Sequence, residues 1–131
     1  MSFRNLGLSP ELKQAIESKG YSEPSEIQQQ AIPSILQGSD IMAGAQTGTG
    51  KTAAFALPIL QRLQNDETKR RRVRTLVLVP TRELASQVGD SFRSYGKNLR
   101  FRTSTLYGGV SIKTQIDKLK KGVDIVVATP G

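Results

Sequence analysis

The sequence has 131 residues, of which 37% are hydrophobic, and 19 lysines and arginines against 11 acidic residues give it a net charge of +8. The absence of cysteine excludes disulfides and thiolate zinc sites, and the absence of histidine removes the commonest metal ligand and general base. No apolar run reaches the ~20 residues of a membrane span, and no signal peptide opens the chain, so we expect a soluble, intracellular, cytoplasmic protein. The positive charge favours polyanionic partners, although ordinary solubility explains it equally well.

Two helices are predicted at the N-terminal end, over residues 9–20 and 24–38. In the first, Ser9 is a suitable cap and Pro10 suits the first helical position. In the second, Pro33 predicts a break or a kink.

Strand-like and helical segments alternate through the rest of the chain. The predicted strands cover residues 40–45, 75–80, 101–108 and 123–130, and the predicted helices cover residues 50–63, 82–97 and 111–121. This alternation predicts an α/β fold with a parallel sheet and crossover helices. Three of the strands are almost continuously apolar, as expected when both faces of a sheet are covered, whereas the third alternates more and is expected towards an edge. Pro58 lies inside a predicted helix whose apolar face continues beyond it, so we expect a kink there rather than a stop.

A glycine-rich loop follows the first predicted strand and opens the next helix. It matches the phosphate-binding pattern G-x-x-x-x-G-K-[ST] with alanine in first place, over Ala45, Gln46, Thr47, Gly48, Thr49, Gly50, Lys51 and Thr52. Glycine lets backbone N–H groups wrap around phosphate oxygens, and the helix start presents its positive end to the same anion. We therefore predict that Lys51 reaches the outer phosphates and Thr52 binds Mg²⁺, which makes both candidate catalytic residues. A structural turn with an incidental lysine is the alternative, and the position between strand and helix disfavours it.

Several other positions have a local structural explanation. Ser25 and Gln28 have the spacing of a capping box, and Thr81 is a good N-cap for the helix that follows Pro80. Gly108 and Gly109 fit a turn after a strand, and Thr129 with Pro130 fits another cap followed by a first helical position. On local sequence alone these explanations suffice.

Five motifs taken in order give a different interpretation, because together they resemble the motifs of DEAD-box RNA helicases. The resemblance rests on GYSEPSEIQ with Phe3 upstream (the Q motif), AQTGTGKT (the family's phosphate loop, alanine included), PTRELASQ (motif Ia), YGG (the glycine doublet) and TPG (the start of motif Ib). They extend across nearly the whole chain, and the opening residues are most similar to the bacterial RhlE-like branch.

The resemblance implies a RecA-like P-loop parallel sheet with helices on both faces, incomplete because the sequence stops at the start of motif Ib. It divides the chain into a Q-motif helical region (1–38) and the first part of the N-terminal RecA-like domain (39–131), without a second RecA-like domain. It implies ATP and Mg²⁺ as cofactors. Gln28 would read the adenine edge, Phe3 or Tyr21 would lie against the ring, and Ser25 would cap the helix beside them.

The resemblance also implies contacts to single-stranded or short duplex RNA, made to the backbone and independent of base sequence. The residues implied are Pro80, Thr81, Arg82, Gly108, Gly109, Thr129, Pro130 and Gly131. The D-E-A-D and S-A-T segments of the family do not occur in these residues. We therefore expect the chain alone to bind nucleotide weakly and to lack RNA-stimulated ATPase activity, and we expect open sheet edges to favour self-association.

Three alternatives stay open from sequence alone. A P-loop kinase or switch NTPase would need neither Gln28 nor RNA, and a non-enzymatic RNA-binding module would not need Lys51. A DNA translocase of the same superfamily would share the motifs, because a preference for RNA over DNA cannot be read from them.

Overall fold

The computed structural model describes residues 3–44, 50–66, 73–107, 115–117 and 122–130. The chain divides into two compact units, one formed by Met1–Asp66 with Ser94–Leu99 and the other by Glu67–Arg93 with Arg100–Gly131. None of the described helices is long and apolar enough to cross a membrane.

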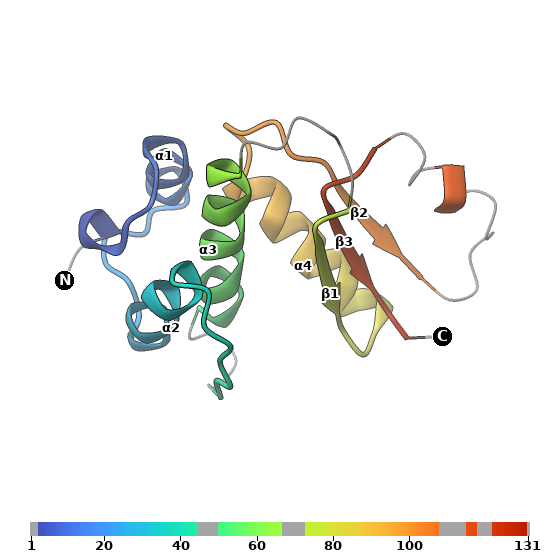
Figure 1. Ribbon diagram of the computed structural model, residues 1–131, viewed down its shortest axis with the longest axis horizontal. Coiled ribbons are helices and arrows are strands. Elements are labelled where there is room, and N and C mark those ends of the chain that lie inside the picture. Colours follow the sequence, from blue (N-terminus) through green and yellow to red (C-terminus); the bar gives the residue numbers. More distant parts are fainter. Residues whose placement is uncertain (1–2, 45–49, 67–72, 108–114, 118–121, 131) are drawn as a thin grey trace. The chain divides into compact units, whose positions relative to one another are not determined.

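The first unit is helical. It contains the 3-10 helix η1 (Phe3–Leu6) and the helices α1 (Pro10–Ser18), α2 (Glu26–Leu36) and α3 (Lys51–Asn65), and α2 packs against α3 (Figure 1). Its core is made of aliphatic side chains with at most 2% of their surface exposed, among them Leu12, Ile16, Ile32, Leu57 and Leu60. Burying one such side chain stabilises a fold by about 1.5–3 kcal/mol, so these residues hold the three helices together.

The helix starts and interruptions of this unit test the sequence predictions. Ser9 accepts a hydrogen bond from the backbone N–H of Leu12 at 3.4 Å, and Pro10 is the first helical residue, as predicted. Helix α3 continues through Pro58 without a stop, which was also predicted. The prediction of a break at Pro33 is wrong, because α2 continues to Leu36. Pro33 lies within the last turn, so little of the helix depends on the hydrogen bond that a proline nitrogen cannot donate.

The predicted strand over residues 40–45 is wrong for the part that is described. Residues 39–44 have no regular structure, and the side chain of Met42 is fully exposed. A strand needs a neighbour that exchanges backbone hydrogen bonds with it, and the three strands of the described sheet pair only with one another. The apolar composition of this segment was therefore not sufficient to predict a strand.

The second unit contains a parallel sheet, as predicted, with the order β1-β3-β2 (Figure 1). Its strands are β1 (Thr75–Leu78), β2 (Thr103–Leu106) and β3 (Ile125–Ala128), all shorter than the predicted segments. Strand β3 is central and nearly fully buried, which explains its continuous apolar run. The more alternating strand, β2, lies at an edge as expected. Of the predicted helix 111–121, residues 115–117 are helical and the others lie outside the described residues.

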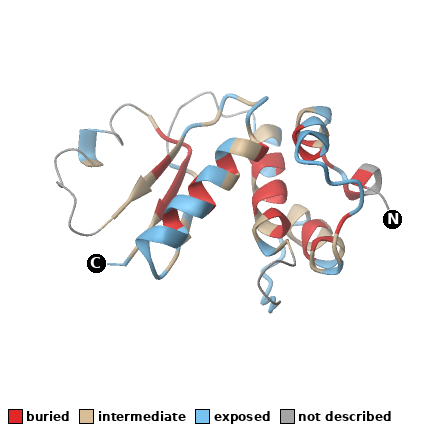
Figure 2. Cartoon of the chain, turned by 180° about the vertical axis from the view of Figure 1, so that it is seen from behind, coloured by how far each residue is buried: buried red, intermediate tan, exposed pale blue. Residues whose placement is uncertain are grey.

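Helix α4 (Arg82–Tyr95) follows β1 and runs along β2. Its buried residues repeat at helical spacing, with Ala85, Val88 and Phe92 on one side and exposed residues on the other (Figure 2). A Cβ atom on Gly89 would lie 2.7 Å from Cγ2 of Thr105, so glycine permits the close approach of helix and strand. On the other face of the sheet, Leu76 and Leu78 of β1 are 60% and 63% exposed. The expectation that both faces of this strand are covered is therefore wrong for the described part of the chain, in which β1 pairs only with β3.

Candidate functional site

The start of α3 is joined to the start of α2 by one buried side chain. Gln28 accepts a hydrogen bond at Oε1 from the N–H of Ser25 (3.0 Å), and its own N–H donates to Oγ of Ser25 (3.4 Å), which completes the capping box that the sequence predicted. Nε2 of Gln28 also donates to the carbonyl of Gly50 at 3.2 Å. We call Ser25, Gln28 and Gly50 the Gln28 cluster. The sequence did not predict this direct contact between Gln28, the proposed adenine-binding residue, and the phosphate loop.

Gly50 has a conformation and an environment that only glycine fits. Its φ of +85° lies in the left-handed region, and a Cβ atom there would overlap Nε2 of Gln28 and come within 3.2 Å of Oγ of Ser25. As the cap of α3 it supplies no side-chain acceptor, and the first turn of α3 carries no acidic residue. The first N–H groups of α3 therefore gain no capping side chain from Gly50 and present a positive helix end.

The predicted phosphate and metal ligands are only partly described. Lys51 and Thr52 are the first two residues of α3, the lysine exposed and the threonine half-buried. Ala45, Gln46, Thr47, Gly48 and Thr49 lie outside the described residues. In the part of the chain that the structure describes, no group of three or more carboxylates is placed to hold a metal ion.

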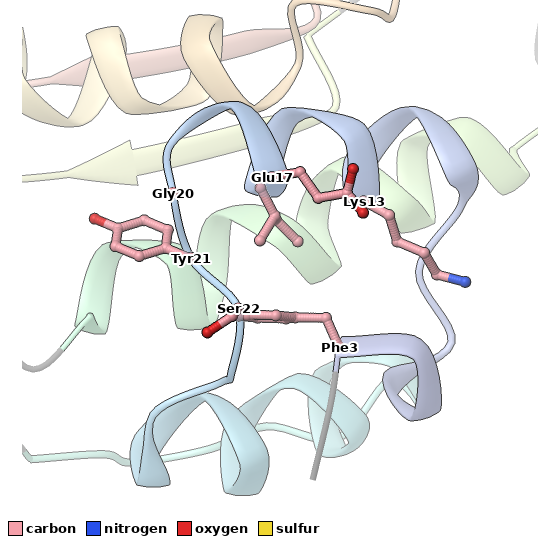
Figure 3. A pocket seen from close by; sticks show the side chains of 7 residues that line it. Phe3, Lys13, Glu17, Gly20, Tyr21 and Ser22 are labelled. Atoms are coloured by element: carbon pink, nitrogen blue, oxygen red, sulfur yellow. The ribbon is translucent and has the colours of Figure 1, made fainter.

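The two predicted aromatic residues line one pocket of about 520 Å³ (Figure 3). Phe3 comes from η1 and is 7% exposed, whereas Tyr21 follows α1 and is 50% exposed. The remaining lining residues are Lys13, Ile16, Glu17, Gly20 and Ser22. Sequence reasoning missed those on α1, although residues 13, 16 and 17 have the spacing of one helical face. Gln28 is not among the residues that line this pocket.

Tyr21 is also tied to a second tyrosine of its unit. Burial, and then the neighbouring Tyr21 to which it is hydrogen-bonded, raise the pKa of Tyr95 to about 12. Nζ of Lys19 lies 4.7 Å from the centre of the Tyr95 ring, a cation–π contact. These contacts fasten the turn after α1 and so fix one wall of the pocket.

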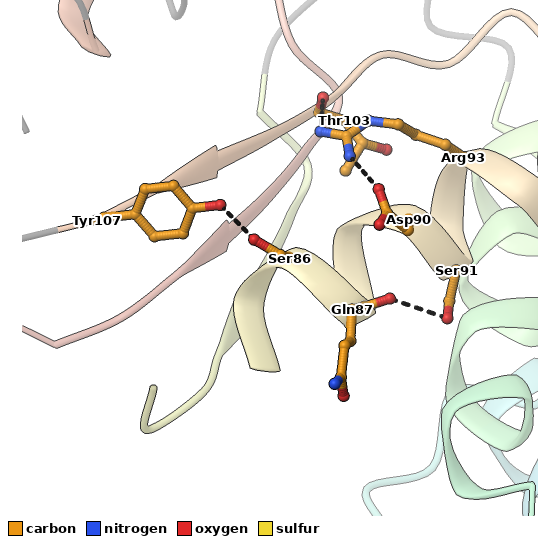
Figure 4. A network of polar contacts seen from close by, with 7 residues as sticks. All are labelled: Ser86, Gln87, Asp90, Ser91, Arg93, Thr103 and Tyr107. Carbon is orange, nitrogen blue, oxygen red and sulfur yellow. Dashed lines mark hydrogen bonds and ion pairs between the residues drawn. The ribbon is translucent and has the colours of Figure 1, made fainter. Parts of the chain in front are cut away.

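A second polar cluster lies at the start of α4. Oγ1 of Thr81 accepts a hydrogen bond from the N–H of Leu84 at 3.1 Å, which confirms the predicted cap. The guanidinium carbon of Arg82 lies 5.0 Å from the centre of the Tyr107 ring. The hydroxyls of Tyr107 and Ser86 are 2.7 Å apart (Figure 4). We call Arg82, Ser86 and Tyr107 the Tyr107 cluster.

These contacts change the acidity of the tyrosine. The hydrogen bond with Ser86, followed by one with Thr105, lowers the pKa of Tyr107 below its ordinary value. The positive charges of Arg82 and Arg93 lower it further. The cluster is thus both hydrogen-bonded and electrostatically favourable to negative charge.

The parallel sheet brings the predicted RNA-binding segments to one edge. The exposed Pro80 and Thr81 follow β1, Tyr107 follows β2, and Thr129 follows β3 and donates its N–H to the carbonyl of Leu106 at 3.2 Å. Carboxyl ends of parallel strands form the usual ligand-binding edge of open α/β sheets. Pro130 is exposed at the same edge, whereas Gly108, Gly109 and Gly131 lie outside the described residues.

Comparison with known proteins gives the family. A family model described as DEAD/DEAH box helicase matches residues 25–131. The chain is 48% identical over 130 residues to the DEAD-box ATP-dependent RNA helicase RhpA of Helicobacter pylori, covering 99% of this chain and 26% of that protein. It is 50% identical over 130 residues to the DEAD-box ATP-dependent RNA helicase CshA of Bacillus cereus and of Bacillus anthracis, covering 99% of this chain and 24% of those proteins.

The chain thus spans about a quarter of the length of these relatives. The family match excludes a P-loop kinase or switch NTPase, whereas the RhlE-like branch and the domain limits at residues 38 and 39 stay predictions. The parallel sheet and its helices fit a partial RecA-like α/β fold. The chain belongs to the DEAD/DEAH box helicase family.

Proposed function

We propose that this chain binds ATP and the backbone of RNA as part of an ATP-dependent RNA helicase. The observation that carries the proposal is the hydrogen bond from Gln28 to Gly50, because it joins the predicted adenine reader to the first residue before the phosphate-binding helix. A group that recognises the base and a loop that holds the phosphates must lie close together to bind one nucleotide.

The amide of Gln28 keeps capacity for a ligand while it holds the protein together. A carboxamide has two acceptor sites on oxygen and two N–H donors, and the folded chain uses one of each. The second acceptor and the second donor match the donor and acceptor on the adenine edge. In this proposal Phe3 or Tyr21 supplies the aromatic surface for stacking. The base would then extend from the amide of Gln28 to the pocket that the two rings line.

The phosphates of ATP bind at residues 45–52 in this proposal. The start of α3 supplies N–H groups and Lys51 supplies a positive charge for the outer phosphates. Thr52 would ligate Mg²⁺ through its hydroxyl oxygen, which suits this cation, with the phosphates supplying further oxygens. When bound, Mg²⁺ would neutralise charge on the phosphates. The 131 residues contain no D-E-A-D or S-A-T segment. We therefore propose that this chain binds ATP without hydrolysing it.

The RNA backbone binds at the carboxyl edge of the sheet in this proposal. The residues are Pro80, Thr81, Arg82, Gly108, Gly109, Thr129, Pro130 and Gly131. Helix starts, an arginine and backbone N–H groups recognise phosphate and sugar without reading bases, so binding is independent of sequence. We propose RNA rather than DNA as the substrate, a cytoplasmic location, and self-association through the exposed edges of β1 and β2.

Nucleobase selectivity of the purified chain tests the proposal. Binding of fluorescent ATP and GTP analogues is measured for the wild type, Gln28→Ala and Gln30→Ala. We expect the wild type to prefer ATP, and Gln28→Ala to lose about tenfold of this preference, since one hydrogen bond contributes about 0.5–1.5 kcal/mol and adenine would lose two. Gln30 is the matched control, because it lies on the same helix with its side chain exposed.

The ratio of the affinities for ATP and GTP distinguishes a loss of adenine recognition from a loss of folding. Gln28→Ala also removes half of a capping box, but a partly unfolded chain would lose ATP and GTP binding equally. Equal affinity of the wild type for both nucleotides, or an unchanged ratio in Gln28→Ala, would contradict adenine recognition by this residue.

A further inference from the structure

Tyr107 is held firmly at the end of β2. Its hydroxyl hydrogen-bonds to Ser86 on α4 at 2.7 Å, and its backbone N–H donates to Oε1 of Gln115 at 2.9 Å. The ring is thus held at its hydroxyl from α4, and the backbone that carries it is held from the segment after β2. A ring held in this way offers a fixed surface to whatever lies on its face.

The guanidinium of Arg82 lies on that face, 5.0 Å from the ring centre. A cation–π contact uses the flat face of a guanidinium and leaves the N–H groups at its rim available as donors. The side chain is exposed, and within the described ranges no residue accepts a hydrogen bond from it.

Arg93 on the same helix is used differently. Its guanidinium donates to the carboxylate of Asp90 at 3.1 Å and to the carbonyl of Thr103 at 3.3 Å (Figure 4). Two of its donors are therefore engaged by the protein itself. The two arginines share a helix but differ in that only Arg82 is oriented by a ring.

We infer that Tyr107 and Ser86 are positioning residues, which hold the guanidinium of Arg82 in the orientation that receives an RNA phosphate. The inference rests on the proposed RNA-binding role of Arg82. Neither Tyr107 nor Ser86 needs to touch RNA. A free arginine side chain would lose rotamer freedom on binding, and a ring that already orients it reduces this loss.

A double-mutant cycle on the complete 131-residue chain tests the inference. Affinity for a fluorescein-labelled oligouridylate is measured by anisotropy for the wild type, Tyr107→Leu, Arg82→Gln and the double variant. We expect about two- to fivefold weaker binding for Tyr107→Leu, the size of an exposed cation–π contact. In the Arg82→Gln background the same change has no further effect, because the tyrosine acts only through the arginine.

Two milder variants separate the ring from its hydroxyl. Tyr107→Phe keeps the ring and loses the contacts of the hydroxyl with Ser86 and Thr105. Its loss of affinity is therefore smaller than that of Tyr107→Leu and at least as large as that of Ser86→Ala. Ser91→Ala is the matched control on the same helix, since this hydroxyl donates only to the carbonyl of Gln87, and it binds as the wild type does.

Relaxation of the Arg82 Nε–H signal in NMR spectra gives a readout without RNA. We expect this group to be more mobile in Tyr107→Leu than in the wild type. Additive losses in the cycle, or an unchanged Arg82 signal, would overturn the positioning role while the RNA-binding role stands. If the wild type does not bind the oligouridylate, or Arg82→Gln binds as tightly as the wild type, the RNA part of the proposed function falls and the inference falls with it.

Discussion

The Gln28 cluster and the Tyr107 cluster organise two helix starts in different ways. In the first, the amide that is proposed to read the ligand is 6% exposed, and both of its polar atoms are hydrogen-bonded to the protein backbone. In the second, the proposed ligand-binding group is exposed and rests on a ring that is itself hydrogen-bonded. The first cluster thus combines folding and recognition in one side chain, whereas the second separates them between Arg82 and Tyr107.

This difference determines what a substitution does. A change in the Gln28 cluster leaves buried polar atoms without partners, which costs about 1–3 kcal/mol for each, so stability and ligand binding fall together. A change in the Tyr107 cluster leaves groups that water can reach, so it alters ligand binding and leaves stability at neutral pH nearly unchanged.

Gly50→Ala breaks the Gln28 cluster. The added methyl group overlaps the amide of Gln28, and a left-handed backbone costs about 1–2 kcal/mol for a residue with a Cβ atom. We expect the free energy of unfolding, measured by urea denaturation, to fall by at least about 2 kcal/mol, with loss of ATP binding. Gly44→Ala is the control, because its Cβ would meet no atom within 4 Å. Equal stability of the two variants would contradict the close packing of Gly50.

Gly89→Ala tests the seam between α4 and β2, on which the Tyr107 cluster depends. The new Cβ would lie 2.7 Å from Cγ2 of Thr105, and overpacking of this kind costs about 1–3 kcal/mol. Thr105→Ser removes that methyl group. In the Thr105→Ser background we expect Gly89→Ala to stabilise the chain by about 1 kcal/mol, since alanine favours a helix over glycine. A destabilising effect in both backgrounds, measured by urea denaturation, would place the strain elsewhere.

Ser25→Ala removes one hydrogen-bonding group from the Gln28 cluster. Loss of an N-cap costs about 1 kcal/mol, so the urea midpoint falls accordingly. Ser22→Ala, an exposed serine in the same loop, serves as the control. If both variants unfold at the same urea concentration, the capping box contributes nothing to stability.

Ser86→Ala has the smallest expected effect, a change in the acidity of Tyr107. Without its first hydrogen-bonding partner, the pKa of Tyr107 rises towards the ordinary value of 10.0, as followed by tyrosinate absorbance. The folded pKa of the wild type lies below the unfolded value, so this group adds stability above pH 10 and the contribution is lost as pH falls through the folded pKa. The Ser86→Ala variant therefore gains less stability at alkaline pH. An identical titration curve would contradict the hydrogen bond.

Sequence patterns predicted the structural features that depend only on residues close together in the chain. The cap at Ser9, the capping box at Ser25 and the cap at Thr81 each need only the next three residues, and all three are formed. The parallel sheet and the edge position of β2 also followed from the alternation of segments and from their apolar patterns.

Features that depend on distant partners were not predictable in the same way. The strand predicted over residues 40–45, which is not formed in its described part, needs a neighbour that no local pattern supplies. The hydrogen bond from Gln28 to Gly50 joins residues 22 positions apart, and the pattern of the capping box gives no indication of it. Arg82 and Tyr107 meet only because the segments that hold them follow parallel strands, which an analysis of register could have suggested.

NMR titration of the chain with a non-hydrolysable ATP analogue tests most directly whether Gln28 and the start of α3 form one nucleotide site. We predict that the side-chain amide signals of Gln28 and the backbone N–H signals of Gly50 and Lys51 shift together and give one dissociation constant. The matching GTP analogue should shift the backbone signals of α3 and leave the Gln28 amide nearly unchanged. A Gln28 amide that does not respond to the ATP analogue, while the start of α3 does, would contradict the account.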